Sequence, residues 1–309
     1  MVAQTDLEHV LDHTRELWDE LRGERLFITG GTGFIGSWLL DTFAYANERL
    51  CLNASALVLT RGRHDNRPGI SFHIGDVRTF VSPKGEFPFV IHGAVESSTD
   101  TYLDDQFDVI TRGTQRVLDF AGRAGTKKLI FLGSGAVYSG TSPYADGKRI
   151  GETTCACSPV PSVIARLFCF VGPYQPLDSH FAIGNFIRAG LAGGPIRVYG
   201  DGTTERSYLY AADLAVWLWT LLFRGAPGQP YNVGSEEVVT IGELAHRVAG
   251  AFHPAVKVEI EKTPEPGRVA DRYVPLSTAG AIQLGLRQWV GLDDAIARTI
   301  RWHGGRDGQ

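Results

Sequence analysis

The feature that most constrains the fold is residues 26–36, LFITGGTGFIG, in which a short apolar run is followed by three glycines. This pattern predicts a buried strand, a tight turn and a helix, because only glycine lets two backbone segments approach so closely. The first N–H groups of a helix starting near Phe34 lack intrahelical partners, so the turn can bind a dinucleotide pyrophosphate. The spacing is GxxGxxG instead of the usual GxGxxG, and a simple strand-to-helix turn is the alternative for this segment alone.

Short β-rich runs alternate with helical stretches as far as residue 171. This alternation predicts a doubly wound parallel α/β sheet of the Rossmann type, whose ligands bind beyond the carboxyl ends of the strands. The later sequence is richer in loops and short elements. We therefore expect a dinucleotide-binding domain over residues 1–171, with returns near 208–234, and a smaller interleaved α/β substrate domain, mainly over 172–309.

The overall composition indicates an ordinary globular protein. The 309 residues are 43% hydrophobic and carry a formal net charge of −4, so there is no basic surface for nucleic acid or an anionic membrane. No apolar run approaches the roughly 18 residues of a membrane span. The N-terminus is acidic and lacks the apolar region of a signal peptide. Four cysteines in so long a chain favour a reducing cytoplasm over a disulfide framework.

A helix is predicted near the N-terminus, with apolar residues at helical spacing from Leu7 and with Asp6 as its N-cap. We expect it to pack on the outside of the first domain.

A candidate reacting centre lies in residues 143–148, PYADGK, where Tyr144 and Lys148 are four residues apart. On a helix both side chains share one face. A lysine ammonium favours the phenolate form of a nearby tyrosine, so Tyr144 can serve as a base near neutral pH. The alternative for this pair alone is a partly exposed helix face on which the lysine stem covers the ring.

Taken together, several motifs resemble one known family. They are TGGTGFIG, an Asp76 after the third strand, Ser134 in GSGAVY, PYxxxK, and the downstream FVGPY, VYGDGTTERSYLYAADLA and YNVGS. Their order and spacing resemble the extended short-chain dehydrogenases/reductases, in the nucleotide-sugar epimerase and dehydratase branch. The resemblance runs from about Arg25 to the C-terminus.

This resemblance implies a role for each matching residue. Tyr144 would remove a proton from a sugar hydroxyl, Ser134 would hydrogen-bond the reacting oxygen, and Lys148 would bind the nicotinamide ribose and lower the Tyr144 pKa. The remaining cofactor contacts would hold the pyrophosphate, through Gly30, Gly33, Phe34, Ile35 and Gly36, or border the adenosine, through Asp76, Val77 and Ala94.

The resemblance also implies a nucleotide-diphosphate sugar as substrate. Arg206 and Arg272 would hold its diphosphate, a role that suits a charged bidentate donor. Asn185 is a further candidate for this contact. For each arginine the alternative is a solvated surface residue or a structural ion pair.

Two departures from the family pattern bear on the reaction. In 4,6-dehydratases of this branch an Asp-Glu pair follows the active-site hydroxyl residue, whereas Gly135 and Ala136 stand here. Neither side chain can transfer a proton, which argues against ordinary 4,6-dehydration, and the glutamate of the branch's decarboxylases is absent too. Glu96 is a carboxylate that can reach the site, or it is solvated or caps the next segment.

The segment from Ser134 to Tyr144 is short for the branch, and so is the segment after Lys148. A more open or differently lidded sugar site is expected, with a shortened helix that ends as early as Thr153, because two prolines and poor helix formers follow. Relatives form their dimer through this helix. We expect a homodimer that this shortening can alter.

The choice of dinucleotide depends on the end of the second strand. An acidic residue there would hydrogen-bond the ribose 2′-OH of NAD, but Thr60 and Arg61 occupy these positions. Arginine suits the 2′-phosphate of NADP, whereas epimerases of the branch mostly keep NAD bound. We expect NAD, with NADP as the alternative.

The function expected from these residues is nucleotide-sugar epimerisation at C4, through transient oxidation to a keto sugar. The alternatives are a dehydratase that acts at another position, a ketosugar reductase that consumes NADPH, and an inert dinucleotide-binding sensor or scaffold.

Overall fold

The computed structural model describes residues 1–95, 103–178, 181–267 and 269–305. Its largest sheet is parallel throughout, in the order β10-β6-β5-β4-β1-β2-β3. The strands are β1 (Arg25–Thr29), β2 (Ser55–Thr60), β3 (Ile70–Ile74), β4 (Phe89–His92), β5 (Lys128–Ser134), β6 (Ser162–Leu167) and β10 (Pro230–Val233). The reversal of strand order between β1 and β4 confirms the predicted doubly wound fold.

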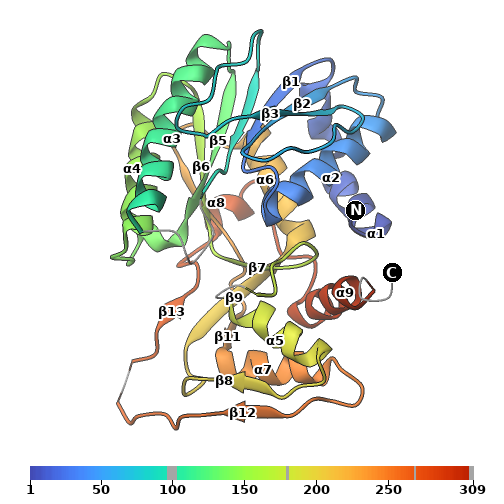
Figure 1. Ribbon diagram of the computed structural model, residues 1–309, viewed down its shortest axis with the longest axis vertical. Coiled ribbons are helices and arrows are strands. Elements are labelled where there is room, and N and C mark those ends of the chain that lie inside the picture. The colour runs from blue at the N-terminus through green and yellow to red at the C-terminus, as the bar shows by residue number, and fades with distance from the viewer. Residues whose placement is uncertain (96–102, 179–180, 268, 306–309) are drawn as a thin grey trace.

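Helices cover both faces of this sheet (Figure 1). On one side lie α3 (Leu103–Arg123) and α4 (Pro143–Cys157), and on the other α1 (Gln4–Thr14), α2 (Phe34–Arg49) and α6 (Ala211–Arg224). Side chains of β1 pack on both faces of the sheet. Phe27 packs among phenylalanines on the α3 side, while Leu26 and Ile28 belong to the core on the side of α2 and α6. Burial on both faces explains why its sequence is uniformly apolar.

The second region lies below the main sheet in Figure 1. Its elements are a sheet of β7 (Cys169–Val171), β9 (Glu205–Tyr210), β11 (Val238–Thr240) and β13 (Arg272–Tyr273), the pair β8 (Ile196–Val198) and β12 (Val258–Ile260), and the helices α5 (Ala182–Leu191), α7 (Ile241–Gly250) and α9 (Leu292–Gly304). Short helices complete the chain, namely η1 (Arg15–Leu21), η2 (Gly135–Val137) and α8 (Ala279–Ile282). Strand β9 runs directly into α6 and so returns the chain to the main sheet.

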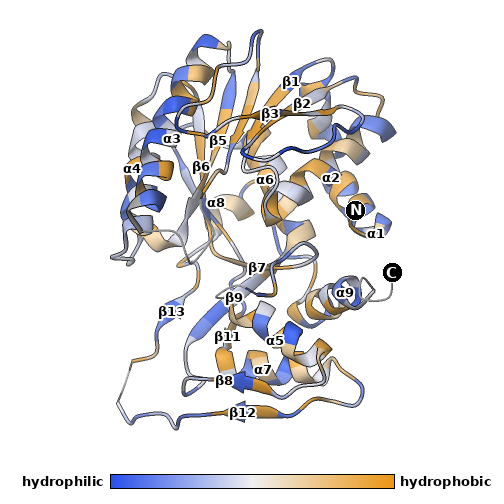
Figure 2. Ribbon diagram, in the orientation of Figure 1, coloured by the Kyte–Doolittle hydropathy of each residue, from blue (hydrophilic) through white to orange (hydrophobic). Residues whose placement is uncertain are grey.

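The distribution of apolar residues agrees with this architecture. Figure 2 shows hydrophobic residues concentrated in the central strands and along α6. Every residue of α6 up to Phe223 is buried. In the described part of the chain, no helix is long and apolar enough to cross a bilayer.

The N-terminal helix differs from the sequence prediction at Asp6. Helix α1 begins at Gln4, so Asp6 lies inside it and does not cap it. Its buried carboxylate accepts hydrogen bonds from the Tyr210 hydroxyl at 2.7 Å and from Arg298 at 2.6 Å. Hydrogen bonds from a hydroxyl and a guanidinium stabilise the Asp6 carboxylate more than a helix-cap hydrogen bond would. The helix packs against α6 and α2.

Helix α4 is longer than the sequence prediction. It starts at Pro143, where Ser142 caps it by accepting a hydrogen bond from the Ala145 N–H, and it continues past Thr153 to Cys157. Its last turn is held by burial, since Cys155 belongs to the core on the α3 side. Tertiary packing therefore outweighs the poor helix propensity of these residues.

Candidate active site

The turn between β1 and α2 forms a tight backbone cradle. Gly30 has φ +77°, and a Cβ there would lie 2.6 Å from the Gly93 carbonyl carbon, while one at Gly36 would collide with the Gly30 carbonyl. Gly33 is the N-cap of α2 and provides no side-chain acceptor for the N–H groups that follow. Phe34 and Ile35, in the first turn, are half-buried. These features fit a bound pyrophosphate, because any side chain at Gly30 or Gly36 would close the cradle.

A buried polar network, which the sequence analysis did not predict, holds the strand ends next to this cradle. The Thr29 hydroxyl accepts hydrogen bonds from the N–H groups of Gly93 and Ala94, at 3.2 and 3.1 Å. Its own proton therefore goes to Nδ1 of His92, at 2.7 Å. Nε2 of His92 must then carry a proton, which it donates to the Thr114 hydroxyl at 3.0 Å. Burial lowers the pKa of His92 to about 3, so the ring stays neutral at physiological pH.

The predicted adenosine contacts, and the residues expected to select the dinucleotide, lie at or just after the carboxyl ends of β2, β3 and β4. Arg78 binds the Asp76 carboxylate through Nε and Nη2, at 2.9 and 2.8 Å, and holds the pKa of that carboxyl below its usual range. Arg61 lies close enough to lower the same pKa further. The Thr60 hydroxyl accepts a hydrogen bond from the Gly62 N–H at 3.3 Å and so stabilises the turn that follows β2. Val77 is buried and Ala94 is half-buried.

The structure brings Ser134, Tyr144 and Lys148 together. Ser134 ends β5 and is buried, Tyr144 lies in the first turn of α4, and the Ser134 hydroxyl is near enough to Tyr144 to affect its pKa. Burial raises the Tyr144 pKa, and the interaction with the Ser134 hydroxyl opposes that rise. The Lys148 ammonium lies 5.7 Å from the centre of the Tyr144 ring. This is the arrangement that the spacing of the two residues predicted.

Lys148 is itself deeply buried. Its Nζ donates to the carbonyl of Leu132 at 2.7 Å, which leaves two of its three protons for other acceptors. Burial lowers the Lys148 pKa to about 8, and the negative charge of Glu152, one turn further along α4, works in the opposite direction. The ammonium is therefore poised to change its charge near neutral pH.

A second tyrosine joins this cluster from a remote part of the chain. The Tyr273 hydroxyl lies 3.1 Å from Oγ of Ser134, although 139 residues separate them, and it donates to the carbonyl of Leu167 at 3.2 Å. Burial raises the Tyr273 pKa. No motif marks this residue in the sequence, because its position results from the pairing of β13 with β9.

The surroundings of Gly135 leave no space for a side chain. A Cβ there would lie 2.5 Å from Cε1 of Phe168, whose ring packs against Tyr273 with centroids 5.0 Å apart. An acidic residue at this position would therefore require Phe168 to move. Glu96, the other carboxylate considered from the sequence, lies outside the described residues.

The predicted diphosphate residues lie on three elements of the second region. Arg206 on β9 and Arg272 on β13 are on adjacent strands, with Tyr273 opposite Arg206. Arg206 is ion-paired with Asp271 at 2.8 Å, and Arg272 with Glu205. Asn185 lies on α5 and accepts a hydrogen bond from Arg188 at 3.0 Å. The Arg206 guanidinium lies 5.9 Å from the centre of the Tyr273 ring, and the Tyr273 hydroxyl in turn contacts Ser134.

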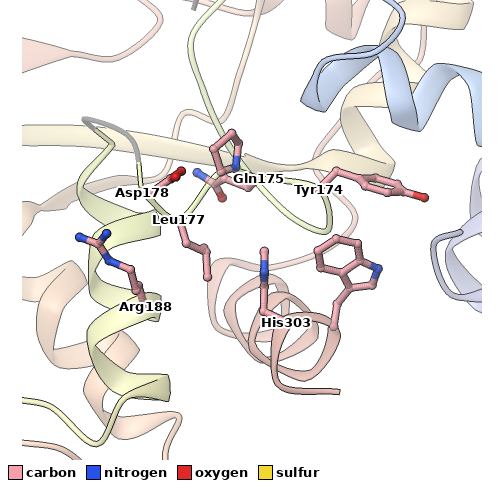
Figure 3. A pocket seen from close by; sticks show the side chains of 8 residues that line it. Tyr174, Gln175, Leu177, Asp178, Arg188 and His303 are labelled. Atoms are coloured by element: carbon pink, nitrogen blue, oxygen red, sulfur yellow. The ribbon is translucent and has the colours of Figure 1, made fainter. Parts of the chain in front are cut away.

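A surface pocket lies elsewhere, between residues 174–178, α5 and α9 (Figure 3). Its lining shares no residue with the site predicted from the sequence. Among the described residues, no cluster of histidine, cysteine and acidic side chains could hold a metal ion.

Comparison with known proteins identifies the family. Residues 26–234, which include the glycine turn, Ser134, Tyr144 and Lys148, match the model of the NAD dependent epimerase/dehydratase family. The chain therefore belongs to this family. It is an enzyme of the extended short-chain dehydrogenase/reductase type, and NAD is its cofactor, as expected from the sequence.

Individual relatives catalyse several reactions. The UDP-N-acetyl-alpha-D-glucosaminuronate decarboxylase of Bacillus cytotoxicus is 28% identical over 266 residues, or 76% of this chain and 82% of that protein. The human dTDP-D-glucose 4,6-dehydratase is 26% identical, and the match covers 93% of this chain and 93% of that protein. Among solved structures, the UDP-glucose 4-epimerase of Thermus thermophilus in complex with NAD is 26% identical, with a TM-score of 0.73 over 91% of this chain and 99% of that one.

Proposed function

We propose that this enzyme is a nucleotide-sugar epimerase that inverts the hydroxyl at C4. The observation that carries the proposal is the absence of an acid–base pair after Ser134. Gly135 and Ala136 cannot transfer protons, and the Phe168 ring occupies the space that a side chain at 135 would need. Oxidation and reduction at a single carbon need one proton-transferring group, whereas elimination of water needs additional ones.

Tyr144 is the base in this proposal. It takes the proton of the sugar hydroxyl, while Ser134 holds the same oxygen by a hydrogen bond. Lys148, whose ammonium lies 5.7 Å from the Tyr144 ring centre, stabilises the phenolate. Bound NAD supplies the redox chemistry at the sugar carbon. Inversion then requires the keto sugar to turn, so that its opposite face is reduced, and Tyr144 returns the proton to the oxygen.

The substrate proposed is a nucleotide-diphosphate sugar. Arg206 and Arg272 would leave their carboxylate partners in part to bind the diphosphate, and Asn185 would add a contact from α5. In this scheme residues 1–171, with 208–234, hold the cofactor, and residues 172–309 mainly bind the sugar nucleotide. The names of the relatives support this class, since each acts on a UDP- or dTDP-linked sugar.

Dehydration is the second candidate, because the human relative that covers 93% of this chain is a 4,6-dehydratase. It requires a proton donor and acceptor other than residues 135 and 136. For this reason we rank epimerisation first.

We also propose a cytoplasmic homodimer. All four cysteines are free thiols, which suits a reducing compartment. The outer surface of α3 and α4, where Ile150 is 44% exposed, is the expected dimer contact. Light scattering on the purified protein tests the dimer, and a monomer at micromolar concentration would contradict it.

Tyr144→Phe tests the proposed catalytic role. We expect turnover of nucleotide sugars to fall by at least about 100-fold, because the general base is lost, while NAD still binds. The control is Tyr199→Phe, since Tyr199 is 72% exposed and is none of the residues proposed to bind or react. Retention of full turnover by Tyr144→Phe would refute the assignment.

A further inference from the structure

The hydroxyl groups around Ser134 form a chain whose protons can be assigned. Oγ of Ser134 has one proton and two lone pairs. One lone pair accepts the N–H of Ala136, at 3.2 Å. We assign the second lone pair to the hydroxyl of neutral Tyr144, which is near enough to Ser134 for the two groups to interact. The Ser134 proton then goes to Tyr273, whose own proton goes to the carbonyl of Leu167. In this state the proton and both lone pairs of Ser134 are used, and the Tyr273 proton has the Leu167 carbonyl as its acceptor.

Loss of the Tyr144 proton reverses this chain. A phenolate cannot donate, so the Ser134 proton turns toward it and the second lone pair of Ser134 becomes vacant. Tyr273 is in reach to fill that lone pair, because its hydroxyl is 3.1 Å from Ser134 Oγ and 3.2 Å from the Leu167 carbonyl. Ser134 and Leu167 are register partners at the carboxyl ends of β5 and β6. The phenol thus bridges two adjacent strand ends and has an acceptor on each.

We propose that Tyr273 is a positioning residue for the proton transfer: its hydroxyl switches from the Leu167 carbonyl to Ser134, and so directs the Ser134 proton toward the reacting oxygens. The role in turnover depends on the proposed function, whereas the hydrogen-bond switch does not. Tyr273 acts through Ser134 and is not itself the base. Its ring is fixed by Phe168 at 5.0 Å and by the Arg206 guanidinium at 5.9 Å, so only the hydroxyl proton has to move.

The test is a titration of Tyr144 in the NAD-saturated protein, followed by its phenolate absorbance. The signal is the difference between each protein and the same protein carrying Tyr144→Phe. Tyr273→Phe keeps the ring and its packing and removes only the hydroxyl. Tyr199→Phe is the control for a tyrosine with no part in the cluster, and thermal unfolding verifies that each variant is folded.

We expect Tyr273→Phe to raise the Tyr144 pKa by about half a unit to one unit, the effect of one lost neutral hydrogen bond. In the Ser134→Ala background the same change should have no effect, because the mediating hydroxyl is gone. An unchanged Tyr144 pKa in the single variant would overturn the proposal. An equal shift in both backgrounds would also overturn it, since Tyr273 would then act without Ser134.

Turnover gives a second readout. If the proposed function holds, Tyr273→Phe lowers kcat about threefold to tenfold at neutral pH, moves the acid limb of the pH profile upward by the same shift and leaves KM unchanged. A rise in KM with unchanged kcat would instead show that Tyr273 only binds substrate, and would contradict the positioning role. Failure of every nucleotide sugar to react would count against the proposed function, while the titration would still decide the role of Tyr273.

Discussion

Arg166 binds the carboxylate of Glu152 with three hydrogen bonds of 2.7–3.1 Å, from Nε to both oxygens and from Nη2 to one. Both side chains are largely buried, at 21% and 9% exposure. Removal of one partner leaves an uncompensated buried charge, so Arg166→Met should lower the free energy of unfolding by about 3 kcal/mol. The double variant with Glu152→Gln should lose less than the sum of the single variants. Urea denaturation measures each value, and strict additivity would contradict a coupled pair.

The Glu152 carboxylate also affects Lys148, one turn away. Because burial lowers the Lys148 pKa to about 8, the ammonium is charged below that pH and neutral above it. Loss of the charge removes support for the Tyr144 phenolate, so activity should decline as pH rises through about 8. Glu152→Gln removes a charge that raises this pKa and should move the alkaline limb of kcat to lower pH. An unchanged limb in that variant would show that Lys148 does not set it.

His92 should make the protein sensitive to acid. Its pKa of about 3 in the fold lies below the usual 6.5, so between these values the unfolded chain binds more protons and stability falls as pH decreases. At pH 5 the loss from this residue is about 2 kcal/mol relative to pH 7. His92→Gln should remove that difference, whereas His246→Gln, at an exposed position, should retain it. Denaturation at both pH values is the measurement, and an equal loss in His92→Gln and wild type would refute the explanation.

The sequence predicted the parts of the site that are local. The glycine turn, the strand end at Ser134 and the Tyr144–Lys148 spacing each depend on a few consecutive residues. Their geometry follows from turn and helix rules that apply in any fold. Parallel strands then bring their carboxyl ends to one edge, which places Ser134 at the same edge of the sheet as the glycine turn.

Contacts that depend on tertiary packing were not predictable in this way. Tyr273 reaches Ser134 only because β13 pairs with β9. Strand β13 has two residues, which is too few for an alternation of apolar and polar residues to indicate a strand. The Thr29–His92–Thr114 network joins three elements whose polar residues look like ordinary strand ends or helix positions in sequence. Asp6 was predicted as a cap because local rules favour an aspartate at that position. In the fold its carboxylate instead binds Arg298, which is distant in sequence.

The most direct test of the central claim is to incubate the enzyme with NAD and with UDP-, dTDP- and GDP-linked sugars, and to identify the products by NMR and mass spectrometry. Epimerisation by Tyr144, with no proton donor at Gly135 and Ala136, predicts a product of unchanged mass whose C4 configuration is inverted, without net reduction of NAD. A product lighter by one water, or one that has lost carbon dioxide, would contradict the account.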